Sequence, residues 1–183
     1  MNHIPRKVPP ARSAFTLIEL LVVIAIIGIL ASMILATAGY VQEKAARSRA
    51  EAEIAALSAA LESYKVDNGD YPLGTNALAV RRALLPLVGD TKPGGGTISA
   101  SELSNFKVYM ELNAGQMNNL TSQKAPTTTS EIIDPFGTRY NYTYPGDVAR
   151  SGVNFFDLWS TGKRATRGNL TQQQWELQWI KNW

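Results

Sequence analysis

The stretch AFTLIELLVVIAIIGILAS, residues 14–32, decides the fold of this chain. The uncharged run that it opens extends from Leu20 to Val41, which is 22 residues. About 20 apolar residues in a helix cross the hydrocarbon core of a bilayer. One carboxylate, Glu19, stands immediately before the run, although an acid within a spanning segment is costly and usually has a partner. The sequence therefore predicts a membrane helix whose single charge needs an explanation.

The segment before this run is short and basic. Residues 1–14 contain Arg6, Lys7 and Arg12 and no acid. The whole chain has 18 Lys+Arg and 15 Asp+Glu, so without this leader 15 basic residues face 15 acidic ones. The net charge of +3 therefore belongs to the N-terminus, where it favours the cytoplasmic side of a membrane. It does not indicate a nucleic-acid-binding protein.

The composition removes several kinds of chemistry. The 183 residues include no cysteine, which excludes disulfides, thiolate nucleophiles and cysteine metal sites. The only histidine is His3, in the leader, so the rest of the chain has no imidazole base. Carboxylates are scattered, and no glycine-rich phosphate loop follows a predicted strand. We expect a protein that is not an enzyme and that needs no cofactor.

Three interpretations of the apolar run compete. A cleaved secretory signal could use the small residues at 36–38, but its core is usually about 7–15 residues, shorter than this run. An ordinary membrane anchor fits the composition and leaves Glu19 unexplained. In the third interpretation the segment is a processed membrane helix that assembles with copies of itself, and the charge serves the assembly.

The third interpretation is carried by a resemblance. Residues 14–19, AFTLIE, followed by a long apolar helix, resemble the class III signal of type IV pilins and type II secretion pseudopilins. The resemblance implies cleavage by prepilin peptidase between Ala14 and Phe15, with N-methylation of the new amino group on Phe15. It also implies that Glu19 pairs with the amine of a neighbouring subunit, which makes Phe15, Thr16 and Glu19 assembly residues. Ala14 stands where the family usually has glycine.

The helix should continue beyond the membrane. Ile54, Leu57, Leu61 and Tyr64 recur at helical spacing, and Asn68-Gly69 supplies a stop. We therefore expect a cleaved leader over 1–14 and a long helix over 15–68 with a transmembrane part at 17–38. A globular part, with a sheet at about 131–161, should occupy 69–183.

The clearest motif of the C-terminal part lies at 131–161. Residues 134–137, DPFG, have proline and glycine where a type I turn wants them. Tyr140, Tyr142 and Tyr144 alternate with polar residues as in a strand, and VNFFDLWSTG (153–162) predicts its partner. This arrangement resembles the major pseudopilin of protein G type in type II secretion. The fold class implied is α+β and pilin-like, with one long helix packed on a small antiparallel sheet.

Other segments support coarser predictions. Residues 77–88, ALAVRRALLPLV, predict a short helix ended near Pro86. Residues 106–112, FKVYMEL, fit a strand, and an upstream capping-box pattern at 99–102 leaves a helix equally open. Thr171 to Gln174 has capping-box form, and Trp175, Trp179 and Trp183 are spaced for one helical face.

Metal and nucleic-acid sites are not expected. Major pseudopilins often bind calcium in an acidic loop after the last strand, but here residues 160–170 carry Lys163, Arg164 and Arg167 and no acid. Residues 67–70, DNGD, predict a turn, because an acid at the calcium-binding spacing is missing. The basic trio could touch DNA, although solvation or contact with a neighbouring subunit is the more ordinary role.

The resemblance implies a structural subunit of a periplasmic pseudopilus, polymerising through its N-terminal helix to drive type II secretion. The implied partners are copies of itself, prepilin peptidase, minor pseudopilins, the inner-membrane assembly platform and membrane lipid. The implied location is the inner membrane, single-pass, with a cytoplasmic N-terminus and a periplasmic C-terminal part. Two alternatives stay open: a type IV pilin for adhesion, motility or DNA uptake, and a membrane-anchored binding module that never polymerises.

Overall fold

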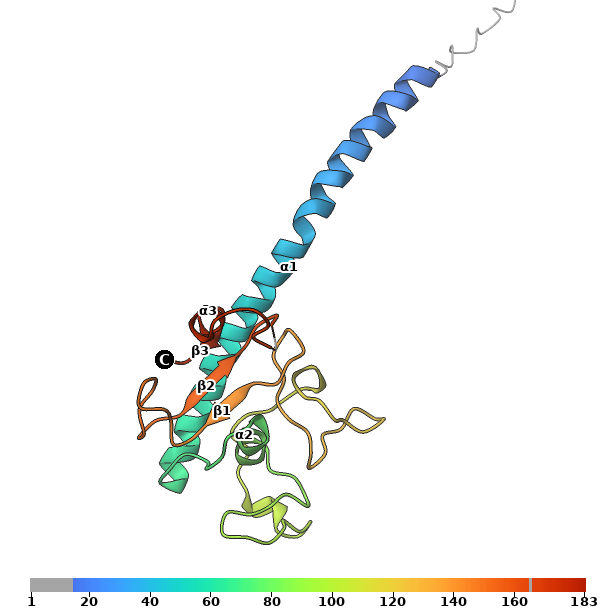
Figure 1. Cartoon of the computed structure of the whole chain (residues 1–183). Coiled ribbons are helices and arrows are strands. Elements are labelled where there is room, and N and C mark those ends of the chain that lie inside the picture. The colour runs from blue at the N-terminus through green and yellow to red at the C-terminus, as the bar shows by residue number, and fades with distance from the viewer. Residues whose placement is uncertain (1–14, 165) are drawn as a thin grey trace, which may run out of the picture. The chain divides into compact units, whose positions relative to one another are not determined.

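The structure is a computed structural model that describes residues 15–164 and 166–183. The chain divides into two compact units between Gln42 and Glu43. Helix α1 (Leu17–Asn68) runs through this division, and all other helices and strands belong to the second unit (Figure 1).

The long helix ends where the sequence predicts a stop. Gly69 adopts the left-handed backbone conformation, with a φ of 88°, and its N–H donates to the carbonyl of Lys65 at 2.7 Å. Glycine reaches this conformation without a steric penalty, and such a residue commonly closes a helix. The stop at Asn68-Gly69 is confirmed.

The sheet has three short antiparallel strands in the order β1-β2-β3. Strands β1 (Asn141–Thr143) and β2 (Asp157–Ser160) pair with Tyr142 opposite Leu158. Strand β3 (Ile180–Lys181) adds to β2, with Ile180 opposite Ser160. The α+β fold, a long helix packed on a small antiparallel sheet, is confirmed. Strand β3 extends the sheet beyond the range 131–161 that the sequence indicated.

The core of the second unit forms between α1, the sheet and α2 (Ala77–Leu84). Helix α1 contributes its apolar stripe, and Tyr142 of β1 and Tyr140 just before this strand pack against it. The side chains packed together include Ile54, Leu57, Leu61, Val80, Leu84, Tyr140, Tyr142, Phe156, Leu158 and Ile180. The alternation predicted around Tyr142 is confirmed, since Tyr140 and Tyr142 are both buried.

The DPFG turn is also confirmed. The N–H of Gly137 donates to the carbonyl of Asp134 at 2.9 Å. The buried carboxylate of Asp134 accepts from the N–H of Phe136 and of Thr138, and Ser160 Oγ in β2 donates to it at 2.6 Å. Because its bonds reach both its own turn and β2, Asp134 fixes the turn to the sheet.

Helix α2 is the short helix predicted before Pro86. Its first basic residue, Arg81, is fully buried and pairs with buried Asp90, Nη2 to Oδ1 at 2.8 Å. Arg81 also donates to the carbonyls of Ser130, at 3.1 Å, and Thr128, at 2.9 Å. This buried cation therefore joins α2 to two loops that are distant in the sequence.

The stretch FKVYMEL is neither strand nor helix. A 3-10 turn, η1 (Leu103–Asn105), precedes it, and a second one, η2 (Ala114–Gln116), follows it. Between them the backbone N–H of Tyr109 donates to the carbonyl of Leu84 at 2.9 Å. The N–H of Met110 donates to the same carbonyl at 3.4 Å, so two backbone bonds hold the stretch at the end of α2.

The prediction of one helical face of tryptophans was wrong. Helix α3 (Gln172–Glu176) has the predicted capping box at Thr171, but it ends before Trp179, and β3 follows. The tryptophans gather nonetheless: Trp159 of β2 stacks on Trp179 with ring centroids 5.3 Å apart. Trp175 and Trp183 contact this pair edge-on. Strand pairing, which the helical spacing cannot report, decides the positions of the last two rings.

Candidate assembly site

The first turn of α1 is closed by its own side chains. Thr16 precedes the helix, and its backbone N–H and hydroxyl donate to Glu19 Oε2 at 2.8 and 2.7 Å. The N–H of Glu19 donates back to Thr16 Oγ1 at 3.3 Å. This reciprocal pattern is a capping box, which satisfies N–H groups that a helix end leaves free. Glu19 therefore has a role within one subunit.

Sequence reasoning missed this role, although the signal was present. Thr16 and Glu19 have the spacing of a capping box directly before an apolar run, which is the pattern that predicts a helix start. Both hydrogen bonds from Thr16 to the carboxylate go to one oxygen, Oε2. Carboxylates accept through both oxygens, so the cap and a second partner are geometrically compatible.

The predicted assembly residues lie at the start of the helix, and the processing site is only partly described. Phe15 stands just outside α1, with 77% of its surface exposed. Thr16 and Glu19 are in direct contact with each other. Ala14 and the leader 1–14 lie outside the described residues.

The first half of α1 exposes its apolar side chains on every side. An 18-residue window of this helix has a mean hydropathy of 2.9, and none of it is buried in the chain. A helix that is apolar all round belongs in a membrane or in the core of a larger assembly. Among the described residues it is the one helix long and apolar enough to cross a bilayer.

The hydroxyls inside this apolar segment are satisfied by the helix itself. Ser32 Oγ donates to the carbonyl of Ile29 at 2.7 Å, and Thr37 Oγ1 donates to that of Ile34 at 3.1 Å. Such bonds allow serine and threonine to lie in hydrocarbon without an unmatched donor. Glu19 is the one residue between Phe15 and Gln42 with a charged side chain at neutral pH.

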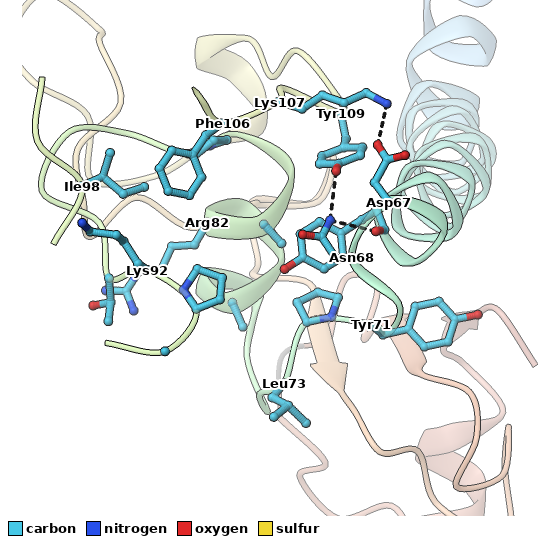
Figure 2. A pocket seen from close by; sticks show the side chains of 18 of the residues that line it. Asp67, Asn68, Tyr71, Leu73, Arg82, Lys92, Ile98, Phe106, Lys107 and Tyr109 are labelled. Atoms are coloured by element: carbon cyan, nitrogen blue, oxygen red, sulfur yellow. Dashed lines mark hydrogen bonds and ion pairs between the residues drawn. The ribbon is translucent and has the colours of Figure 1, made fainter. Parts of the chain in front are cut away.

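The second unit presents a hollow of about 810 Å³ beside the end of α1 (Figure 2). Lys107 Nζ donates to Asp67 Oδ2 at 2.7 Å, and Asn68 Nδ2 donates to the Tyr109 hydroxyl at 2.9 Å. The hydrogen bond from Lys107 lowers the pKa of Asp67. These contacts join α1 to the loop around Tyr109, and they pair all four of these side chains within the structure. We assign no chemistry to this hollow.

The loop after β2 carries the basic residues that replace an acidic calcium loop. Lys163 Nζ donates to Glu43 Oε2 of α1 at 3.2 Å, and both side chains are mostly exposed. Across the described residues, no three acidic or histidine side chains gather closely enough to hold a metal ion.

We expect the stability of the chain to be independent of calcium. The full chain in detergent should melt at the same temperature with a chelator or with excess calcium, because residues 160–170 offer no carboxylate ligand. Circular dichroism at 222 nm follows the transition. A clear upward shift on adding calcium would contradict this expectation and would point to ligands elsewhere.

Comparisons with known proteins agree with this architecture. The family described as prokaryotic N-terminal methylation motif matches residues 10–35, and the family described as type II secretion system (T2SS), protein G, matches residues 39–85. The type II secretion system core protein G of Vibrio cholerae is 31% identical over 157 residues, covering 86% of this chain and 86% of its own length. No solved structure matches the chain.

Two further relatives carry the same description. The core protein G of Pseudomonas aeruginosa is 31% identical and covers 86% of this chain and 87% of its own length. That of Aeromonas hydrophila is 40% identical over 60% of this chain and 78% of its own length. An N-terminal methylation motif followed by a long apolar helix and a small sheet is the architecture of the pseudopilin class. The chain belongs to the protein G family of type II secretion, the major pseudopilins, which are structural subunits of the secretion system.

Proposed function

We propose that the chain polymerises through α1 into a periplasmic pseudopilus that drives type II protein secretion. The observation that carries the proposal is the uncovered apolar segment of α1, with one carboxylate at its start. In a single subunit, only lipid can cover these side chains. In a filament, neighbouring helices cover them, so the same surface serves both states.

The proposal includes a direct pairing of charges between subunits. Removal of the leader leaves a positive amino group on Phe15, which becomes costly once apolar helices surround it. Glu19 of a neighbouring subunit supplies the opposite charge, and its second carboxylate oxygen leaves the cap intact. Such a pair can also set the axial register of the helices, a role well attested for buried polar pairs.

The proposed topology places the leader in the cytoplasm and the unit Glu43–Trp183 in the periplasm. The leader's three basic residues favour this orientation. Prepilin peptidase then acts at the cytoplasmic face, between Ala14 and Phe15, and the amine is methylated. Minor pseudopilins and the inner-membrane assembly platform are the further partners that this function requires.

The test of the function is complementation. A strain that lacks the chain should retain its secreted proteins in the periplasm, and the chain supplied in trans should restore export and, when overexpressed, form antibody-labelled filaments. Intact export in the deletion strain, combined with lost twitching or DNA uptake, would favour the type IV pilin alternative instead.

Processing gives a separate expected result. Mass spectrometry of the chain purified from membranes should give a mature N-terminus at Phe15 carrying one added methyl group, because the cleavable bond lies between a basic leader and an apolar helix. In a strain without prepilin peptidase the chain should keep residues 1–14. A mature chain that begins at Met1 or at Gly39 would refute the pseudopilin processing.

A further inference from the structure

Six exposed basic side chains occur next to the junction of the two units. Three belong to α1 and three to the loop between β2 and α3. Residues 161–175 of this loop region contain no acid. The six form the junction cluster, which consists of Lys44, Arg47, Arg49, Lys163, Arg164 and Arg167.

Hydrogen bonds hold the loop residues of the junction cluster against α1. Lys163 Nζ lies 3.2 Å from Glu43 Oε2, and Arg47 Nη1 donates to the carbonyl of Gln178 at 3.2 Å. Trp175 Nε1 donates to the carbonyl of Arg164 at 3.3 Å, which fixes the loop from its other side. Lys163 therefore lies beside the start of the second unit's part of α1, although it is 120 residues away in the sequence.

Covalent connection places this cluster close to the membrane. Glu43 is the second residue after Val41, where the uncharged run ends. At about 1.5 Å of rise per residue it lies roughly 3 Å of helix beyond that run. The headgroup region extends several ångströms beyond a hydrocarbon core about 30 Å thick. Side chains bonded to residues 43 and 47 are therefore within reach of headgroups, whatever the orientation of the second unit.

The cluster has a surplus of positive charge. Within the described part of the chain, two carboxylates form ion pairs with it: Glu43 with Lys163, and Glu51 with Arg47 at 3.6 Å. A lysine or arginine close to a surface of anionic lipid is attracted to it by about 1 kcal/mol, on either side of the membrane. Trp175, which is partly exposed beside the loop, is a residue type enriched at the membrane–water interface.

We propose that the junction cluster binds the headgroups of anionic phospholipids while the unassembled subunit is in the bilayer. The proposal rests on the membrane anchoring included in the proposed function. A bilayer is favoured over nucleic acid because the cluster is tethered within reach of headgroups. Assembly then requires that these contacts break, so lipid composition tunes the release of subunits from the membrane.

The test uses the full chain, one copy per nanodisc. The natural absence of cysteine allows a single label at Asn169→Cys, an exposed position in the loop. A fluorophore there is quenched by a nitroxide on a small, constant fraction of lipid headgroups. We expect stronger quenching in discs with phosphatidylglycerol than in phosphatidylcholine alone. The excess should vanish in about 1 M salt, where the screening length is about 3 Å.

Paired variants decide whether the cluster is responsible. Arg164→Gln with Arg167→Gln should lower the equilibrium constant for the lipid-bound loop by about tenfold or more. Arg164→Lys with Arg167→Lys should preserve it. The matched control, Lys124→Gln with Arg139→Gln, removes two charges from outside the cluster and should change nothing.

Each other outcome has a defined meaning. Equal quenching in both lipids, in chains that incorporate normally, overturns the lipid proposal and leaves the pseudopilin function intact. Quenching that requires two copies per disc also overturns it, in favour of a subunit contact. A chain that fails to incorporate into any disc contradicts the membrane anchoring itself, and with it the proposed function.

Discussion

A chain carrying Glu19→Ala should insert into the membrane and be cleaved, yet form no filaments when it is the only copy. Insertion should be normal or slightly better, because removing an acid near a spanning segment offsets the loss of one helix cap. The cleavable bond lies upstream of the change. Filament formation should fail because the amine on Phe15 of the next subunit would be left among apolar helices without its counter-charge.

The capping box makes a sharper variant available. Glu19→Gln keeps an acceptor for the Thr16 N–H and hydroxyl, since glutamine serves at this position of a capping box. It removes only the charge. If the intersubunit charge pair is the essential role, the Gln variant should fail like the Ala variant. If capping is the essential role, the Gln variant should assemble.

Thr16→Ala is the matched opposite, because it weakens the cap and keeps the carboxylate. Membrane fractionation, N-terminal sequencing and electron microscopy of overexpressed filaments separate insertion, processing and assembly for all three variants. Wild-type filaments from Glu19→Gln would refute the charge-pair account. An uncleaved Glu19→Ala chain would indicate instead that the peptidase reads this residue.

Arg81→Met should destabilise the second unit by about 3–5 kcal/mol, the range found when one member of a buried ion pair is removed. The buried carboxylate of Asp90 would lose its closer cation, and the carbonyls of Thr128 and Ser130 would lose a donor. Since domains are stable by only about 5–15 kcal/mol, much of the stability would be lost. Denaturant unfolding of the full chain in detergent, followed by tryptophan fluorescence, measures the change.

The neighbouring arginine provides the control. Arg82 is on the same helix, its side chain is 37% exposed, and its Nε lies 3.6 Å from Asp90 Oδ1. Arg82→Met should cost under about 1 kcal/mol, as exposed ion pairs do. Adding Asp90→Asn to Arg81→Met should recover part of the loss, because no unpaired charge then stays buried. Equal effects of Arg81→Met and Arg82→Met would show that burial of the pair is unimportant.

The long helix, the turn and the first two strands could be predicted because their signals are local. Apolar spacing along α1, glycine at 69 and the DPFG turn each act within a few residues. The position of β3 could not be predicted in this way. Its two residues become a strand only by pairing with β2, about 20 residues earlier.

The buried ion pair had no readable signal. Arg81 and Arg82 look alike in the sequence, and only the packing of α2 against loops at 90 and 128–130 buries one and exposes the other. The tryptophans gave a clear signal that was wrong. Their spacing fits one helical face, but α3 ends at Glu176, before Trp179 and Trp183. Regular spacing shows which residues would share a face if a helix formed, and long-range pairing decides whether the helix forms.

At the N-terminal part of the chain, too, local features could be predicted and long-range contacts could not. Phe15, Thr16 and Glu19 are predicted assembly residues because of a short motif, and the spacing of the last two also predicts the cap that joins them. The contact of Lys163 with Glu43 spans 120 residues of sequence and could not be predicted. The basic residues of the loop after β2 are evident in the sequence, whereas their contact with α1 is not.

The bonds between Thr16 and Glu19 also bear on how a cell stores this protein. In such a subunit, Thr16 and Glu19 already supply hydrogen-bond partners to each other at the start of α1. The subunit can therefore remain a monomer in the bilayer. We therefore expect a standing reserve of dispersed subunits rather than small clusters formed to hide a bare carboxylate. Growth would then be set by how quickly the secretion machine recruits from that reserve, and a burst of export could draw on molecules made long before.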